Sequence, residues 1–158
     1  GGETEAANED IVIRDVQLVD DAGEVLDTVP HGSPLRLRMH YEALAPVDDP
    51  VFGFAIHAEN GVHIMGTNTR IDGVRTGLVE GPGTVEFLVA PCPLTPGPYH
   101  VSAAISDTHV QHIFDRHDRE YQLLVRLGQD LPPVGLVDLH GRWTLSGSVV
   151  DGAVETTS

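Results

Sequence analysis

Short runs in which apolar residues alternate with polar ones recur along this chain, and no long stretch carries the three-to-four-residue apolar spacing of an amphipathic helix. The clearest run covers residues 35–41, where Leu35, Leu37 and Met39 point one way and the residues between them point the other. The 17 glycines and 11 prolines are spread throughout and separate the runs with turns. This pattern predicts an all-β fold, an immunoglobulin-like antiparallel β-sandwich of about eight or nine strands with little or no helix.

The expected strands follow the apolar alternation from one turn to the next. A slip in the alternation near Asp15 predicts a bulge, Asn60-Gly61 predicts a hairpin, and the Pro- and Gly-rich segment before Tyr99 predicts a tyrosine corner. Residues 72–83 have the composition of a loop. The strands are expected at residues 11–20, 35–41, 51–59, 62–67, 84–90, 99–106, 110–114, 120–127 and 135–145. The sandwich therefore covers residues 11–146, with disordered tails at 1–10 and 147–158.

Charge and composition exclude several classes of function. Nine arginines, no lysine and 24 acidic residues give a net charge of −15 at pH 7, which disfavours nucleic acid and anionic membrane surfaces as partners. The single cysteine, Cys92, rules out a disulfide framework and a cysteine-rich zinc module. A phosphate-binding loop needs a lysine, and the common hydrolase and metalloprotease motifs are absent. We therefore expect a non-catalytic domain with no cofactor and no bound metal.

One segment keeps a metal-dependent enzyme open as an alternative. Residues 107–118 contain three histidines and three aspartates. Side chains two residues apart on a strand share a face, so His109 with Asp107, or His117 with Asp115, could converge on one ion. The simpler interpretation is a solvated loop between two edge strands.

A polar surface is the stronger candidate for function. If the strands at 51–59, 99–106 and 120–127 share one sheet, as in most sandwiches of this type, their outward residues form one face. That face combines small residues with hydrogen-bond donors and acceptors, and a shallow trough of this kind suits a hydroxyl-rich ligand. The candidate binding residues are His57, His100, Ser102, Gln122, Arg126 and, on the neighbouring strand, Thr67. An ordinary solvated sheet face is the alternative.

Few aromatic residues remain for stacking against a ligand. Alternation directs most of them into the core, and only Phe114 and Trp143 are left as candidates. Trp143 shares its parity with Val137 and Leu139, so we expect it to pack in the core or at a dimer interface, with stacking on a sugar as the alternative.

Five short motifs occur in an order and spacing that resemble one known family. They are Gly-x-Pro-Leu-x-Leu-x-x-x-Tyr at residues 32–41, Asp-Pro-Val-Phe-Gly-Phe-Ala-Ile at 49–56, Gly-Thr-Asn-Thr at 66–69, Leu-x-Pro-Gly-x-Tyr at 94–99 and Gly-Arg-Trp at 141–143. Over residues 11–145 the chain is similar to the C-terminal domain of Wzt-type ATP-binding subunits, which belong to ABC exporters of O-antigen and related polysaccharides.

The resemblance implies a glycan-recognition module. In such a module the sandwich binds the exported polysaccharide, often at its modified non-reducing end, while a separate ATPase domain drives transport. The resemblance also implies a homodimer that exchanges a C-terminal strand, here residues 135–145. It places the domain in the cytoplasm at the inner face of the cell membrane, with the transmembrane subunit as partner and residues 1–10 as a linker from the ATPase domain. The alternative is a dimerisation or gating domain of the same subunit that binds no glycan.

Overall fold

The computed structural model describes residues 10–147, and all of its regular structure is β-strand. The tails predicted at residues 1–10 and 147–158 lie outside the described residues, apart from Asp10 and Gly147. The strands are β1 (Ile11–Val19), β2 (Val29–Pro30), β3 (Leu35–Asp48), β4 (Val51–Ala58), β5 (His63–Asn68), β6 (Leu78–Val89), β7 (Gly97–Ser106) and β8 (Ile113–Arg126).

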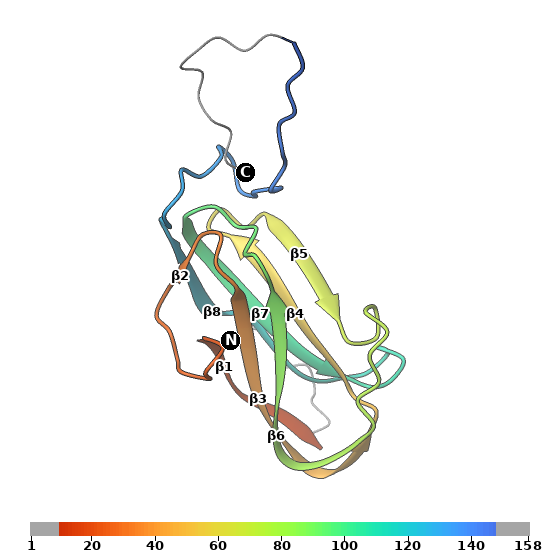
Figure 1. The fold of residues 1–158 in the computed structure, drawn as a ribbon. Coiled ribbons are helices and arrows are strands. Elements are labelled where there is room, and N and C mark those ends of the chain that lie inside the picture. The colour runs from red at the N-terminus through yellow and green to blue at the C-terminus, as the bar shows by residue number, and fades with distance from the viewer. Residues whose placement is uncertain (1–9, 148–158) are drawn as a thin grey trace.

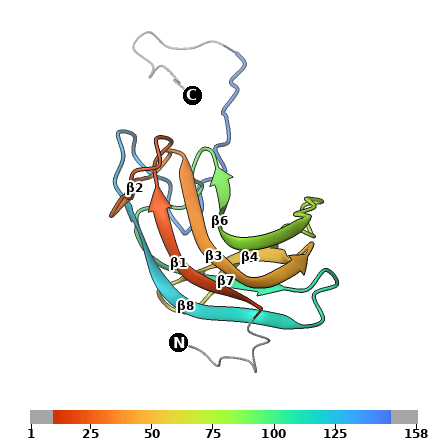
Figure 2. The ribbon, with the colours of Figure 1, turned by 90° about the horizontal axis from the view of Figure 1, so that it is seen from below.

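These strands form two sheets that pack face to face. One sheet has the order β1-β3-β6 and the other the order β2-β8-β7-β4-β5. Neighbouring strands run antiparallel except for β2 and β8. Figure 1 gives the arrangement of the strands, and Figure 2 shows the two layers from below. The predicted all-β sandwich is confirmed, and β4, β7 and β8 share one sheet as expected.

The core lies between the two layers and is made of the inward residues of each strand. Leu35, Leu37 and Met39 are all buried, as their alternation predicted. Tyr99 is also buried, and its hydroxyl donates to the carbonyl oxygen of Thr95 at 2.6 Å. This contact satisfies a phenol inside the core and is the predicted tyrosine corner.

The bulge predicted near Asp15 is formed, and a hydrogen bond beside it connects the two sheets. The register of β1 against β3 shifts between Ile13 and Asp15. The amide of Ile13 donates to Oδ2 of Asp115 on β8 at 2.7 Å. A carboxylate from the opposite sheet therefore satisfies this amide of β1.

Two strands are longer than predicted. β6 begins at Leu78, so the second half of the loop expected at residues 72–83 is strand, paired with the extended end of β3. β8 is a single strand of 14 residues where the sequence predicted a pair at 110–114 and 120–127. Its register against β7 shifts twice, and such bulges interrupt the alternation on which the prediction depended. The prediction for Phe114 is wrong for the same reason. This side chain was expected to be free for stacking, but it is buried in the core.

The strand predicted at residues 135–145 is not formed. Val137 makes one bridge to Leu94, and the chain beyond Asp138 runs away from the sandwich (Figure 1). Trp143 is 87% exposed, so the core packing considered for it is wrong. A strand is stabilised by a paired neighbour, and beyond Asp138 the described residues pair with no strand of their own chain.

Candidate functional site

A trough of roughly 650 Å³ lies on the outer face of the five-stranded sheet, within the size range of ligand pockets. Its lining comes from β4, β5, β7 and β8 and from the two loops at residues 69–77 and 107–112. The small and polar lining residues include Gly53, Ala55, His57, His63, Thr67, Asn68, Ser102, Ala104, Arg116, Asp118 and Arg119, and apolar side chains come from Ile71, Val110 and Ile113. The trough occupies the sheet face from which the sequence predicted binding.

Small residues keep the floor of the trough low. Gly53 of β4 lies opposite Ala104 of β7, and Ala55 lies opposite Ser102. A Cβ atom added at Gly53 would lie 3.1 Å from both the Cβ of Asn68 and the carbonyl oxygen of Thr67. A larger residue at this position would therefore displace β5 as well as fill the trough.

A hydrogen-bonded group of three side chains lines the trough. The Ser102 hydroxyl donates to Oδ1 of Asp118 at 3.2 Å and accepts from the amide of Arg119 at 2.8 Å. Nε of Arg119 lies 3.7 Å from Oδ1 of Asp118. Arg119 has φ 55°, which marks the irregular part of β8. These contacts fix the hydroxyl and the carboxylate in place, so both can act as oriented hydrogen-bond partners for a ligand.

Two stacked histidines line the trough next to β5. The rings of His57 and His63 lie 4.7 Å apart with 19° between their planes. His57 is 8% exposed, its Nδ1 has no partner within the described residues, and burial lowers its pKa. A neutral imidazole keeps one donor and one acceptor nitrogen, so His57 suits a neutral, hydroxyl-bearing ligand.

The structure separates the predicted binding residues into two groups. His57, Ser102 and Thr67 line the trough. His100 and Gln122 face each other on β7 and β8 outside the lining, and His100 contacts Glu59 at 3.1 Å. Arg126 is farther along β8, opposite Pro30 of β2. All six were assigned to one face, but the trough covers only part of it.

Other lining residues were not predicted from the sequence. Arg116 and Asp118 lie in the segment interpreted as a loop, and their outward direction would have been predicted only from a continuous β8. Arg116 forms no ion pair within residues 10–147, so its guanidinium donors are available to a ligand. Ile71 and Val110 belong to loops whose position depends on contacts distant in sequence, which local patterns do not reveal.

Comparison with known proteins gives the family. The family model described as the Wzt C-terminal domain matches residues 2–139. The chain belongs to the Wzt C-terminal domain family. A domain of this family is non-catalytic. No curated protein matches the sequence significantly.

A solved structure of the same family shows the same fold. A crystal structure of the C-terminal domain of Wzt superposes with a TM-score of 0.74 at 21% identity, covering 92% of this chain and 90% of that chain. A CARDB domain from Pyrococcus furiosus, in complex with di-metal ions, matches with a TM-score of 0.42 at 14% identity over 75% of this chain and 94% of that chain. Residues 10–147 of this Wzt C-terminal domain contain no helix able to span a membrane.

The carboxylates of the alternative metal segment have other partners in this Wzt C-terminal domain. Oδ1 of Asp107 accepts the amides of Gln111 and His112 and so caps a turn. Asp115 contacts the Ile13 amide, and Asp118 contacts Ser102. Within residues 10–147, no three His, Cys, Asp or Glu side chains are grouped closely enough to hold a metal ion. Of the two pairs in that hypothesis, His117 and Asp115 do lie close, with Nε2 of His117 3.6 Å from Oδ2 of Asp115, but no third ligand joins them within residues 10–147.

Proposed function

We propose that this domain recognises the polysaccharide exported by its ABC transporter, and that the trough is the binding site. Membership of the Wzt C-terminal domain family suggests a role in a polysaccharide exporter and implies an ABC transporter as partner. The observation that carries the proposal is the trough itself, whose floor of Gly53, Ala55 and Ala104 lies beside oriented polar groups. A sugar ring presents hydroxyls at its edge, and this lining offers both donors and acceptors to them.

The contacts available favour weak binding at each site. A net hydrogen bond contributes about 0.5–1.5 kcal/mol, so a few of them give micromolar to millimolar affinity. Weak sites suffice for a repeating polymer held by a dimer, because the second contact forms at high effective concentration. Weak binding also allows the polymer to be released during export.

An NMR titration of the labelled domain with polysaccharide purified from the source organism tests the proposal. Amide shifts should cluster at Gly53, Ala55 and Ser102. Ser102→Ala should weaken binding, because it removes a hydroxyl that orients Asp118. Gln122→Ala is the matched control, since Gln122 projects from the same sheet outside the trough. A silent titration at millimolar repeat units would contradict glycan recognition, and shifts confined to His100 and Gln122 would place the site outside the trough.

A second candidate function, dimerisation, is favoured by the C-terminal segment. Leu139, Trp143 and Leu145 are all strongly exposed, and the segment after Asp138 runs away from the sandwich (Figure 1). Up to Asp138 the chain is tied to its own domain, because the Asp138 amide donates to the carbonyl of Pro93. An exchanged strand would therefore begin after Asp138 rather than at residue 135.

Truncation distinguishes the two functions. Removing residues 139–158 should convert a dimer into a folded monomer, measured by light scattering coupled to size-exclusion chromatography. Glycan binding retained in that monomer would assign recognition to the trough and dimerisation to the segment. We further propose that the partners are an ATPase domain and a transmembrane subunit, with the domain in the cytoplasm at the inner face of the membrane.

A further inference from the structure

Two loops close one end of the trough, and the first is anchored at its start by hydrogen bonds between Thr69 and Phe52 of β4. Residues 69–77 carry Ile71 and residues 107–112 carry Val110, and both side chains line the trough. Ile71 is 69% exposed and Val110 is 43% exposed. Packing in the core therefore does not fix these side chains, and their position depends on the polar contacts of the loops.

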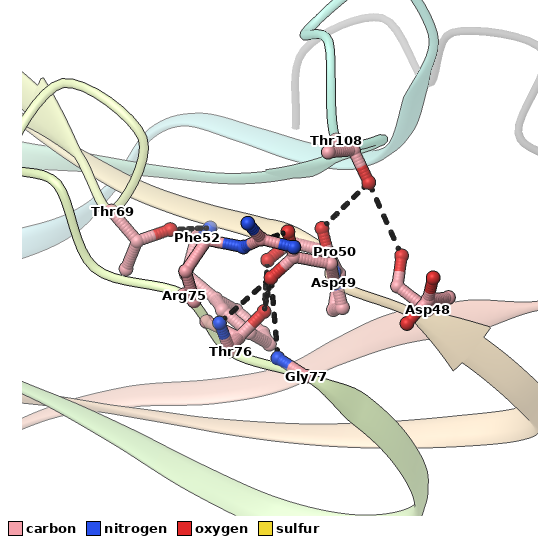
Figure 3. Close-up of polar contacts among 9 residues, drawn as sticks. All are labelled: Asp48, Asp49, Pro50, Phe52, Thr69, Arg75, Thr76, Gly77 and Thr108. Atoms are coloured by element: carbon pink, nitrogen blue, oxygen red, sulfur yellow. Dashed lines mark hydrogen bonds and ion pairs between the residues drawn. The ribbon is translucent and has the colours of Figure 1, made fainter.

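Asp49, in the turn between β3 and β4, holds the first loop. Its Oδ1 accepts the amides of Thr76 at 2.8 Å and Gly77 at 3.2 Å, and its Oδ2 accepts Nε of Arg75 at 2.8 Å. The amide of Asp49 in turn donates to the carbonyl of Gly77 at 2.6 Å. Figure 3 shows the carboxylate among these three loop residues. All of the side-chain hydrogen bonds that Asp49 forms within residues 10–147 go to this loop.

The same turn holds the second loop through its backbone. The hydroxyl of Thr108 donates to the carbonyl oxygens of Asp49 at 3.0 Å and Asp48 at 3.3 Å (Figure 3). Nη1 of Arg70 donates to the carbonyl of His109 at 2.8 Å, which joins the two loops directly. The turn and both loops are therefore one hydrogen-bonded unit.

Burial of the Asp49 carboxylate would destabilise the fold if its hydrogen bonds were not formed. Asp49 is 7% exposed and has φ 53°, a left-handed conformation that glycine adopts most readily and that aspartate adopts more often than most residues. Burial of a carboxylate is unfavourable without hydrogen-bond partners. The Thr76 and Gly77 amides, with the Arg75 guanidinium, hold the pKa of Asp49 below its usual range. A glycine could form this turn without burying a charge, so the carboxylate is explained by the loop that it holds.

We propose that Asp49 is the positioning residue of the trough. Its carboxylate fixes the end of the first loop, and its backbone carbonyl holds the second loop, which Arg70 joins to the first. Asp49 thereby keeps Ile71 and Val110 at the closed end and sets ligand affinity without touching the ligand. The part of this inference that concerns affinity rests on the proposed glycan function. The part that concerns the order of the loops can be measured without any ligand.

Asp49→Gly is the decisive variant, because glycine adopts φ 53° without strain and the change removes only the side chain. Asp48→Asn is the matched control, since Asp48 is the exposed neighbour and its carboxylate forms no hydrogen bond or ion pair within residues 10–147. Val125→Ala is a second control that removes buried methyl groups near the opposite end of β8. Asp49→Asn keeps one acceptor oxygen for the loop amides and should restore most of the native behaviour.

Hydrogen exchange measures the order of the loops. The amides of Val74 and Val110 bond within the loops, and the amide of Asp72 bonds to the carbonyl of Asn68 at the end of β5. Exchange of all three amides should accelerate at least about tenfold in Asp49→Gly by local opening. It should be unchanged in Asp48→Asn, and Val125→Ala should leave these loop amides unaffected even where it loosens the core. Native exchange rates for all three amides in Asp49→Gly would overturn the proposal, whether or not any polysaccharide binds.

Affinity for polysaccharide from the source organism supplies the second readout. It should fall at least about fivefold in Asp49→Gly, because the loop side chains must then be ordered on binding, and it should recover in Asp49→Asn. Faster loop exchange with unchanged affinity would overturn the role in binding. Faster loop exchange in a domain whose native form binds no polysaccharide would support the positioning of the loops and refute the glycan function.

Discussion

Val110 combines backbone strain with a place in the trough, and this combination predicts an unusual response to Val110→Gly. Its φ is 56°, and the left-handed conformation costs an L-residue about 1–2 kcal/mol, more for a β-branched side chain. Strain of this kind persists where the surrounding structure imposes it and is frequent at functional sites. Glycine at this position should therefore relieve the strain while it removes a side chain from the trough.

The expected change in stability follows from three opposing contributions. Relief of strain gains about 1–2 kcal/mol, the greater freedom of glycine in the unfolded chain costs about 0.5–1 kcal/mol, and loss of a half-buried valine side chain costs about 1 kcal/mol. The free energy of unfolding of Val110→Gly should thus stay within about 1 kcal/mol of the native value. Affinity for the polysaccharide should nevertheless fall, because Val110 lines the trough.

Val62→Gly is the matched control. Val62 is similarly exposed at 49% and has no positive φ, so the same substitution there gains nothing from relief of strain. It should lose about 1.5–2 kcal/mol and leave affinity unchanged. Urea denaturation measures the stability of both variants, and NMR titration measures their affinity. If Val110→Gly loses as much stability as Val62→Gly, the argument from strain is wrong, and if its affinity is native, Val110 does not contribute to binding.

Three further predictions concern other parts of the domain. Tyr99→Phe removes the buried hydroxyl that donates to Thr95 and should lower the free energy of unfolding by about 1–2 kcal/mol in urea; a native value would contradict the tyrosine corner. Glu86→Gln should flatten the acid limb of stability against pH, since hydrogen bonding from Arg38 lowers the pKa of Glu86 from 4.5. The stabilisation is present above that unfolded value and is lost as the pH falls through the lowered one, so an unchanged acid limb in thermal unfolding would refute it. Cys92 is fully buried, and burial raises the pKa of its thiol, so a thiol reagent should label it only on unfolding; rapid labelling of the native domain would show that the thiol is accessible.

The layers of this fold could be predicted from the sequence because alternation reports directly on burial. Leu35, Leu37 and Met39 alternate with arginine and histidine, and a strand with one buried face requires that spacing. The bulge near Asp15 and the tyrosine corner at Tyr99 were also predicted, because each has a local sequence signal. The first is a slip in the alternation, and the second is the Pro- and Gly-rich segment before Tyr99. The common sheet of β4, β7 and β8 followed from the sandwich template, and the predicted trough face depended on it.

Long-range contacts explain what the sequence did not reveal. The continuity of β8 depends on two register shifts against β7, and a bulge looks like a strand end when only alternation is considered. Arg116 and Asp118 were missed as trough residues for this reason. The segment at residues 135–145 has strand-like alternation, but beyond Asp138 its described residues pair with no strand of their own chain, so its sequence predicted a strand that is not formed.

The loop end of the trough could not be predicted for a different reason, because polar contacts between residues far apart in the sequence hold it. Asp49 lies 27 residues from Thr76 and 59 from Thr108 along the chain, so no local pattern could have paired them. Their contacts are polar, whereas the floor of the trough is the outer surface of strands fixed by apolar packing on their other face. Opening the loops exposes little apolar surface and should require much less free energy than opening β4 or β7. Substitutions in residues 69–77 or 107–112 can therefore change the shape of the trough without a cost to the core, whereas a larger residue at Gly53 must also displace β5.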